Sequence, residues 1–396
     1  MHDDDLTPDA PTAKGHDRRA FLKRAGLVGT GAFASSAALA ACGGKSKSID
    51  SQIGGTAGAA TGKTANLPDS LKNKTIGLAF LTLADPNVQV IRASLEEAAK
   101  RANLNWTFTQ FDGQGKPDQA QKGLQSFISK KVDMIYLEGI PPRLVKSELA
   151  RAKAAGIPVV GGFTAAPLDD GILFDYAAIL ESDSVVLNEY MLTELNQLHA
   201  GKSEIKIALV DSDLDVILGR TKVLEGLLQL ASNKKVKVVG RQNIDLADPV
   251  GSSTKIASSF LTKHPDLDGI WTNYPTSAIA SANAVSQKNK ADQVKVYGHI
   301  ANTAAIEALR DAKSPISATS WIDLVYTSYA TLGFMLDVLT KKPVARTVAY
   351  TNPVPVTVLA RPTIADQIPG DGTTWVFGNA TYRDGFVQTW SQRYAA

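Results

Sequence analysis

Short apolar runs alternate with amphipathic stretches from Lys74 onward, and this alternation constrains the fold more than any other feature of the chain. In the first half, four runs have the length of buried strands, at 75–81, 106–111, 133–137 and 157–162. Apolar residues recur at helical spacing between them, at 86–103, 118–130 and 144–155. Strands joined by crossover helices of this length form parallel sheets, so the pattern predicts an α/β fold.

The same alternation returns after the stretch 182–200. Strands are predicted at 205–210, 236–239, 269–271 and 294–297, and helices at 218–230, 254–263 and 276–287. A chain of 396 residues is too long for one ordinary domain and comfortable for two. We therefore expect two Rossmann-like lobes, each with a parallel sheet.

The N-terminal segment has the pattern of an export signal. Residues 17–23 read D-R-R-A-F-L-K, and the paired Arg18 and Arg19 resemble the twin-arginine signal. Residues 25–41 carry no charge, but they are too few and too weakly apolar for a membrane span. Small residues then precede Cys42, which resembles the lipobox of bacterial lipoproteins. Residues 1–42 are thus predicted to be a twin-arginine signal with a lipobox.

Cys42 is the single cysteine of the chain, which excludes a disulfide framework. The resemblance implies that Cys42 is lipidated and anchors the exported protein to a membrane, in the periplasm or at the cell surface. The alternatives are a small buried thiol, or a cleavable signal in which the cysteine is coincidental. Gly, Ser, Thr, Ala and Lys dominate the sequence that follows, so we expect a flexible tether over 43–72.

The composition excludes a nucleic-acid partner. Lys and Arg number 42 against 39 Asp and Glu, and the formal charge of +3 gives no strongly basic face. Apolar residues make up 44% and charged residues 20% of the chain, as in soluble globular proteins.

Ligands of open parallel sheets bind outside the carboxyl ends of the strands, and this rule selects the candidate site residues. In the first half they are Asp85, Asn87, Asp112, Glu138 and Phe163, and in the second half Asp211, Asn273, Tyr274 and His299. These carboxylates, amides and aromatic rings suit a small polar ligand in a cleft between lobes.

Several candidates have a structural alternative. Asp85 and Asp112 stand where a helix N-cap is common. Asp211, Asp213 and Asp215 resemble a metal cluster but lack the glycine and distal glutamate of a calcium loop, so we predict neither a metal nor a cofactor. His299 suits a hydrogen-bonded pocket or the core.

Residues from about 73 to 358 resemble the type I periplasmic binding proteins, closest to the ribose-binding and related sugar-binding proteins. The resemblance is carried by I-G-L-A at 76–79 with D-P-N at 85–87, A-A-G-I-P-V-V at 154–160, and H-P-D-L-D-G-I-W-T-N at 264–273, with V-Y-G at 296–298 and I-S-A-T at 316–319. It implies a hinge that crosses between the lobes near Asp183, Trp321 and Thr351. Lobe 1 would then comprise 73–183 plus 322–350, and lobe 2 would comprise 184–321 plus 351–396.

The resemblance adds Asp183, Arg220, Trp321 and Asp323 to the candidate ligand-binding residues. The charged clamp of the sugar binders is altered, however. Val223 replaces an arginine, Tyr274 and Ile300 each replace an aspartate, Gly162-Phe163 replaces Asp-Arg, and Asn87-Val88 replaces paired aromatics. We therefore expect a ligand other than ribose: another carbohydrate, a polyol, or a smaller, more aromatic or less hydroxylated solute.

The predicted function is a monomeric solute-binding lipoprotein that delivers a sugar-like ligand to the membrane permease of an ABC importer. The alternative is a sensory protein that presents a non-sugar ligand to a membrane receptor. A repressor of the lactose type is disfavoured because an export signal stands in place of a helix-turn-helix. An enzyme is disfavoured because no nucleophile elbow, phosphate loop, paired cysteines or His-Glu metal motif is present. The aromatic-rich segment beyond Arg361 is expected to pack over lobe 2 or the hinge, or to dock a partner.

Overall fold

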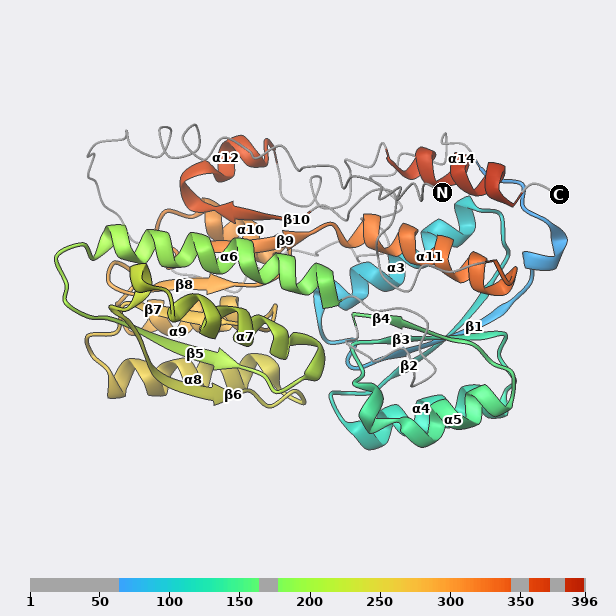
Figure 1. Cartoon of the computed structure of the whole chain (residues 1–396), viewed down its shortest axis with the longest axis horizontal. Coiled ribbons are helices and arrows are strands. Elements are labelled where there is room, and N and C mark those ends of the chain that lie inside the picture. Colours follow the sequence, from blue (N-terminus) through green and yellow to red (C-terminus); the bar gives the residue numbers. More distant parts are fainter. Residues whose placement is uncertain (1–63, 164–176, 343–355, 371–381, 395–396) are drawn as a thin grey trace, which may run out of the picture. The chain divides into compact units, whose positions relative to one another are not determined.

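The computed structural model describes residues 64–163, 177–342, 356–370 and 382–394, all within one compact unit, Lys47–Ala396. It contains two α/β lobes, each built on a mostly parallel sheet (Figure 1). The prediction of two such lobes is confirmed.

Lobe 1 has a four-stranded parallel sheet in the order β2-β1-β3-β4. Its elements are β1 (Thr75–Phe80), α3 (Pro86–Arg101), β2 (Thr107–Asp112), α4 (Pro117–Ser129), β3 (Met134–Glu138), α5 (Lys146–Ala154), β4 (Val159–Gly162) and α11 (Leu324–Leu339), with short 3-10 turns η1 (Asp69–Leu71) and η2 (Pro142–Leu144). Helix α4 packs on β1 and β2, and α3 lies beside α11 (Figure 1). The central strand β1 is buried: a Cβ atom on its Gly77 would lie 2.6 Å from the Phe127 ring of α4.

Lobe 2 has a six-stranded sheet in the order β10-β9-β8-β7-β5-β6, in which only β10 is antiparallel to its neighbour. Its elements are α6 (Ala177–Leu198), β5 (Ile205–Asp211), α7 (Asp215–Leu228), η4 (Ala231–Asn233), β6 (Val236–Asn243), α8 (Pro249–Lys263), β7 (Gly269–Thr272), α9 (Ser277–Gln287), β8 (Lys295–Gly298), α10 (Thr303–Arg310), β9 (Ile316–Ile322), β10 (Val356–Ala360), η5 (Arg361–Thr363) and α12 (Ile364–Gln367). Helix α6 packs on α7, β9 and β10, whereas α8 packs on α9 and α9 on β7 and β8.

Two helices of lobe 2 begin earlier than predicted. Helix α8 begins at Pro249 because the Asp248 side chain caps it, accepting a hydrogen bond of 3.0 Å from the Gly251 N–H. Helix α7 begins at Asp215. The dipeptide Asp248-Pro249 is a typical start of a helix. The helix prediction rested on apolar periodicity alone and therefore missed it.

Helix α6 occupies the stretch that separates the two predicted runs of strands. It is held by Leu187, Met191 and Leu195, which lie one helical turn apart and are fully buried against the sheet of lobe 2. Asp183 is part of this helix, which packs on elements of lobe 2, and the predicted crossing near it stays a prediction. The crossing near Trp321 falls where β9 ends at Ile322 and α11 begins at Leu324. Thr351 lies outside the described residues.

The ends of the body differ from the predicted boundaries. Residues 1–42 and most of the tether lie outside the described residues, but 64–72 pack on lobe 1: Ala65 is buried, and the Leu71 carbonyl accepts a hydrogen bond of 2.6 Å from Trp106 Nε1. Helix α14 (Tyr382–Arg393) packs on α11 of lobe 1, where the sequence analysis assigned 351–396 to lobe 2. The reason is an aromatic contact, since the Trp390 and Tyr329 rings stack with centroids 5.7 Å apart.

Candidate functional site

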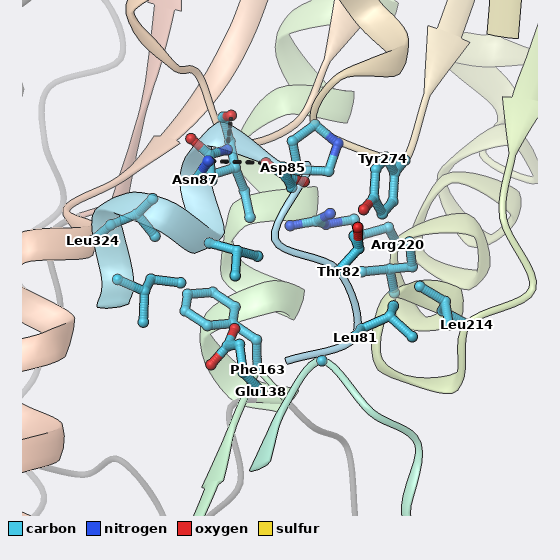
Figure 2. A pocket seen from close by; sticks show the side chains of 16 residues that line it. Leu81, Thr82, Asp85, Asn87, Glu138, Phe163, Leu214, Arg220, Tyr274 and Leu324 are labelled. Carbon is cyan, nitrogen blue, oxygen red and sulfur yellow. Dashed lines mark hydrogen bonds between the residues drawn. The ribbon is translucent and has the colours of Figure 1, made fainter. Parts of the chain in front are cut away.

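A cavity is lined by residues from both lobes, most of them at or just after the carboxyl ends of strands (Figure 2). Its polar lining consists of Thr82, Asp85, Asn87, Glu138, Arg220 and Tyr274. Its remaining lining consists of Leu81, Val88, Ile91, Gly139, Phe163, Leu214, Ile217, Pro275, Ile300 and Leu324. The rule that ligands bind at strand carboxyl ends thus selects the same edge of both sheets. Among the thirteen predicted ligand-binding residues, Asp85, Asn87, Glu138, Phe163, Arg220 and Tyr274 lie on the wall.

Asp85 both caps a helix and lines the cavity, so its two alternative roles coincide. It is the N-cap of α3 and accepts a hydrogen bond of 2.9 Å from the Asn87 N–H. The Tyr274 hydroxyl of lobe 2 also hydrogen-bonds to its side chain. Burial raises the pKa of Asp85 to about 6, against the lowering effect of these two donors.

Asn87 connects the two lobes at the cavity. Its Nδ2 donates a hydrogen bond of 3.0 Å to the carbonyl oxygen of Ile300, which follows β8 of lobe 2. Ile300 has a φ of 53°, in the left-handed region that is rare for a branched residue. The Ser320 hydroxyl of β9 supports that conformation by accepting a hydrogen bond of 3.0 Å from the Ile300 N–H.

Glu138 ends β3 and is 2% exposed. The Tyr136 hydroxyl donates to its Oε2. Burial raises the pKa of Glu138 to about 8, the Tyr136 hydroxyl opposes the shift, and the charge of Asp85 adds to it. Gly162 of the neighbouring strand leaves room for this pair, because a Cβ atom there would collide with Tyr136 Oη and Glu138 Oε2. The cavity therefore holds two carboxyl groups that resist ionisation.

Arg220 lines the cavity from α7 and is fully buried. Its Nε donates to Asp183 Oδ2 at 2.9 Å, and its Nη1 donates to the Asn273 carbonyl at 2.7 Å. Asp183 therefore lies behind the cavity and holds the arginine in place. Val223, where the sugar binders have an arginine, is half-buried and does not line the cavity.

Asp211, Asn273 and His299 are not part of the cavity lining and lie behind the wall, so their role as ligand contacts stays a prediction. Asp211 is 2.5 Å from Arg241 Nε and accepts a hydrogen bond of 3.0 Å from the Thr221 hydroxyl. The Asn273 side-chain amide donates to this carboxylate and to the Ser212 carbonyl at 3.1 Å. His299 Nδ1 lies 2.8 Å from the Thr272 carbonyl, and burial lowers the pKa of the imidazole well below its usual value.

Three further candidates lie away from the cavity. Asp112 accepts hydrogen bonds of 3.0 Å from Leu83 N–H and 2.9 Å from Gln114 N–H, which fix the loop after β1. Asp323 caps α11 and accepts 2.9 Å hydrogen bonds from the Tyr382 hydroxyl. Trp321 is half-buried in β9, paired with Thr357 of β10. Cys42 lies outside the described residues.

The apolar part of the wall is what the sequence analysis missed. Leu81 directly follows β1 and Leu214 follows β5, so the strand-end rule contained them, whereas Ile217 lies within α7. Only polar and aromatic residues were selected there, because an aliphatic residue in a pocket looks the same in sequence as one in the core.

The described residues contain no group of three His, Cys, Asp or Glu side chains arranged to hold a metal ion. Within the same residues, no helix combines the length and apolar character that a membrane crossing needs.

The sequence was compared with protein-family models and with known proteins. A family model described as "Periplasmic binding protein domain" matches residues 76–343. The "ABC transporter periplasmic-binding protein YphF" of Escherichia coli (strain K12) is 21% identical over 243 residues, 61% of this chain and 72% of that protein.

Solved structures share the fold. The 5-methylthioribose transporter solute-binding protein of Thermotoga lettingae, in complex with 5-methylthioribose, has a TM-score of 0.68 at 16% identity, over 83% of this chain and 100% of that one. An ABC transporter solute-binding protein of Agrobacterium vitis with bound allitol has a TM-score of 0.64 at 17% identity, over 75% and 98% of the two chains.

Proposed function

The chain belongs to the periplasmic binding protein family, and we propose from that premise that it is the exported solute-binding component of an ABC importer. It would bind a sugar or a sugar-like small solute in the cavity described above and deliver it, chemically unchanged, to a membrane permease. Proteins of this family and fold are solute-binding transport proteins and are not enzymes.

The observation that carries the proposal is a cavity lined from both lobes at the carboxyl ends of their strands. Asn87 of lobe 1 hydrogen-bonds to the Ile300 carbonyl of lobe 2 beside it, so a ligand there would be enclosed by both lobes. The solutes bound in similar structures, 5-methylthioribose and allitol, favour a ligand of sugar or polyol size. The aliphatic part of the wall favours one with fewer hydroxyl groups than ribose.

Isothermal titration of the mature protein with allitol, D-allose and 5-methylthioribose tests the proposal. We expect one of them, or a close relative found by extending the panel, to bind with one-to-one stoichiometry. Val88→Trp, which fills the cavity from its half-buried wall, should abolish that binding. Binding that survives in Val88→Trp would place the ligand elsewhere and contradict the proposal.

Lipid anchoring at Cys42 is a separate part of the proposal, supported by the paired Arg18 and Arg19, the uncharged stretch 25–41 and the small residues before the cysteine. Cys42→Ser should convert a membrane-bound, palmitate-labelled protein into an unlabelled one, since the thioether that carries the diacylglycerol cannot form. Equal labelling of Cys42→Ser and the natural chain would contradict this part and leave solute binding untouched.

A further inference from the structure

The four buried carboxyl groups in and behind the cavity differ in their partners. Asp183 and Asp211, which lie behind the wall, each have an arginine: Arg220 Nε is 2.9 Å from the first, and Arg241 Nε is 2.5 Å from the second. Asp85 and Glu138 lie on the wall (Figure 2). In the part of the chain that the structure describes, their partners are a backbone N–H and the hydroxyl groups of tyrosines.

The cavity therefore contains two acidic side chains, Asp85 and Glu138, that form no ion pair with a lysine or an arginine among the described residues. Arg220 also lines it, but it is ion-paired with Asp183, and its Nε and Nη1 donate to Asp183 and to the Asn273 carbonyl; its Nη2 makes no hydrogen bond among the described residues. Glu138 is 2% exposed, and the Tyr136 hydroxyl donates to its Oε2. A carboxylate buried in apolar surroundings is costly unless a cation or several donors compensate it. A solute that enters the cavity can supply the cation or the hydrogen-bond donors that these carboxyl groups lack.

We infer that the solute bound in this cavity carries a protonated amine, held by Asp85 and Glu138, on a body that packs against the aliphatic wall. This inference rests on the proposed function and names the ligand class of the same site. An ammonium group offers three N–H donors, and hydrogen bonds between an ammonium and a carboxylate are stronger than those between neutral groups. Val88, Ile91 and Ile217 would contact the carbon frame. An amino sugar or an amino alcohol on a carbocycle has this chemistry.

Matched pairs of probes that differ only in an amine or hydroxyl group test the inference. D-glucosamine is compared with D-glucose, and aminocyclohexanol with cyclohexanediol, by isothermal titration of the mature protein near pH 7.5. In at least one pair, we expect the amine to bind about tenfold or more tightly than its hydroxyl analogue, because charge-assisted hydrogen bonds are about twice as strong as neutral ones. A hydroxyl member that binds as tightly as its amine in both pairs would overturn the inference while supporting the proposed function. Amines that do not bind overturn it as well, and the sugar titration then decides whether the proposed function also fails.

Two conservative variants assign the preference to the named carboxyl groups. Asp85→Asn retains an N-cap side chain for α3, and Glu138→Gln retains the size of the glutamate beside Tyr136. In the double variant, the affinities for the amine and for the hydroxyl member of a pair should differ by no more than about threefold. The reason is that the tenfold preference of the natural chain comes from the charge of the two carboxylates. Asp248→Asn, at the exposed N-cap of α8, is the control and should keep the full preference. An amine preference that persists in the double variant would overturn the assignment to Asp85 and Glu138.

Discussion

At the scale of single residues, Glu138 has the most consequential surroundings in the cavity. It stands at the carboxyl end of β3, where the chain leaves a fully buried strand, and its neighbours are the Tyr136 hydroxyl and the backbone of Gly162. A carboxyl group in such a place is stable when protonated, and binding of a cation would favour its ionised form. The stability of the ligand-free protein and its ligand affinity should therefore depend on the same side chain.

The pH dependence of unfolding tests this property of Glu138. Between about 4.5, its ordinary pKa, and about 8, its pKa in the folded protein, the folded state holds a proton that the unfolded state has released. The contribution of Glu138 is thus fully present below pH 4.5 and falls as pH rises to 8, by about 1.4 kcal/mol for each unit of pKa shift. Urea denaturation from pH 5 to 8 should show that Glu138→Gln loses less stability with rising pH than the natural chain. Parallel curves for the two proteins would contradict a raised pKa.

Gly162 provides a second test at this scale. Gly162→Ala places a methyl group against Tyr136 Oη and Glu138 Oε2 inside a packed sheet, so we expect a loss of about 1–3 kcal/mol of stability and weaker ligand binding. Gly219→Ala is the matched control, because a Cβ atom there has open space in helix α7, and it should leave stability unchanged or raise it slightly. Denaturation midpoints of the two variants that shift equally would show that the crowding at Gly162 is unimportant.

At the scale of elements, α14 is the least expected part of the molecule. Its aromatic residues face α11: the rings of Tyr326 and Tyr382 lie 5.0 Å apart, and the Tyr382 hydroxyl binds the Asp323 cap where the chain enters α11 from β9. Arg393 adds an ion pair to Asp337 at 2.7 Å. The helix therefore fastens the C-terminal part of the chain to lobe 1, next to the segment that joins the lobes.

Trp390 is the largest buried side chain of this helix: it is 2% exposed and stacks on Tyr329. Trp390→Ala should destabilise the protein by about 3–5 kcal/mol, the usual range for removal of a buried indole. Gln392→Ala, on the exposed side of the same helix, should have almost no effect. A small effect of Trp390→Ala in urea denaturation would mean that α14 does not contribute to the folded core.

The sequence predicted elements well where periodicity was strong and less well elsewhere. The strands β1 and β3 are continuous apolar runs and were identified directly. The β10 strand was not, because Val356–Ala360 is only five residues long. Helix α6 was missed because polar residues are mixed with its apolar ones, such as Leu187 and Met191. Two of these polar residues, Ser184 and Asn188, are buried and form a hydrogen bond of 3.0 Å.

At the scale of the whole molecule, the site could be predicted as far as the topology determines it. Asp85, Glu138, Phe163 and Tyr274 follow from the position of strand ends, and Arg220 from the family resemblance. Which side of the backbone such a residue faces depends on tertiary packing, and for this reason Asp211, Asn273 and His299 turned out to lie behind the wall. Their partners Arg241 and Thr272 lie on β6 and β7. The register between these strands and their neighbours cannot be predicted from the local sequence.

The central claim is that this protein encloses one small solute between its lobes and releases it unchanged. Mass spectrometry of the small molecules released on denaturing the mature protein, purified from its own cells, tests the claim most directly. The account predicts a single solute of about sugar size, equimolar with the protein and missing from Val88→Trp preparations. A solute that co-purifies equally with Val88→Trp, or one recovered only as a converted product after incubation, would contradict it.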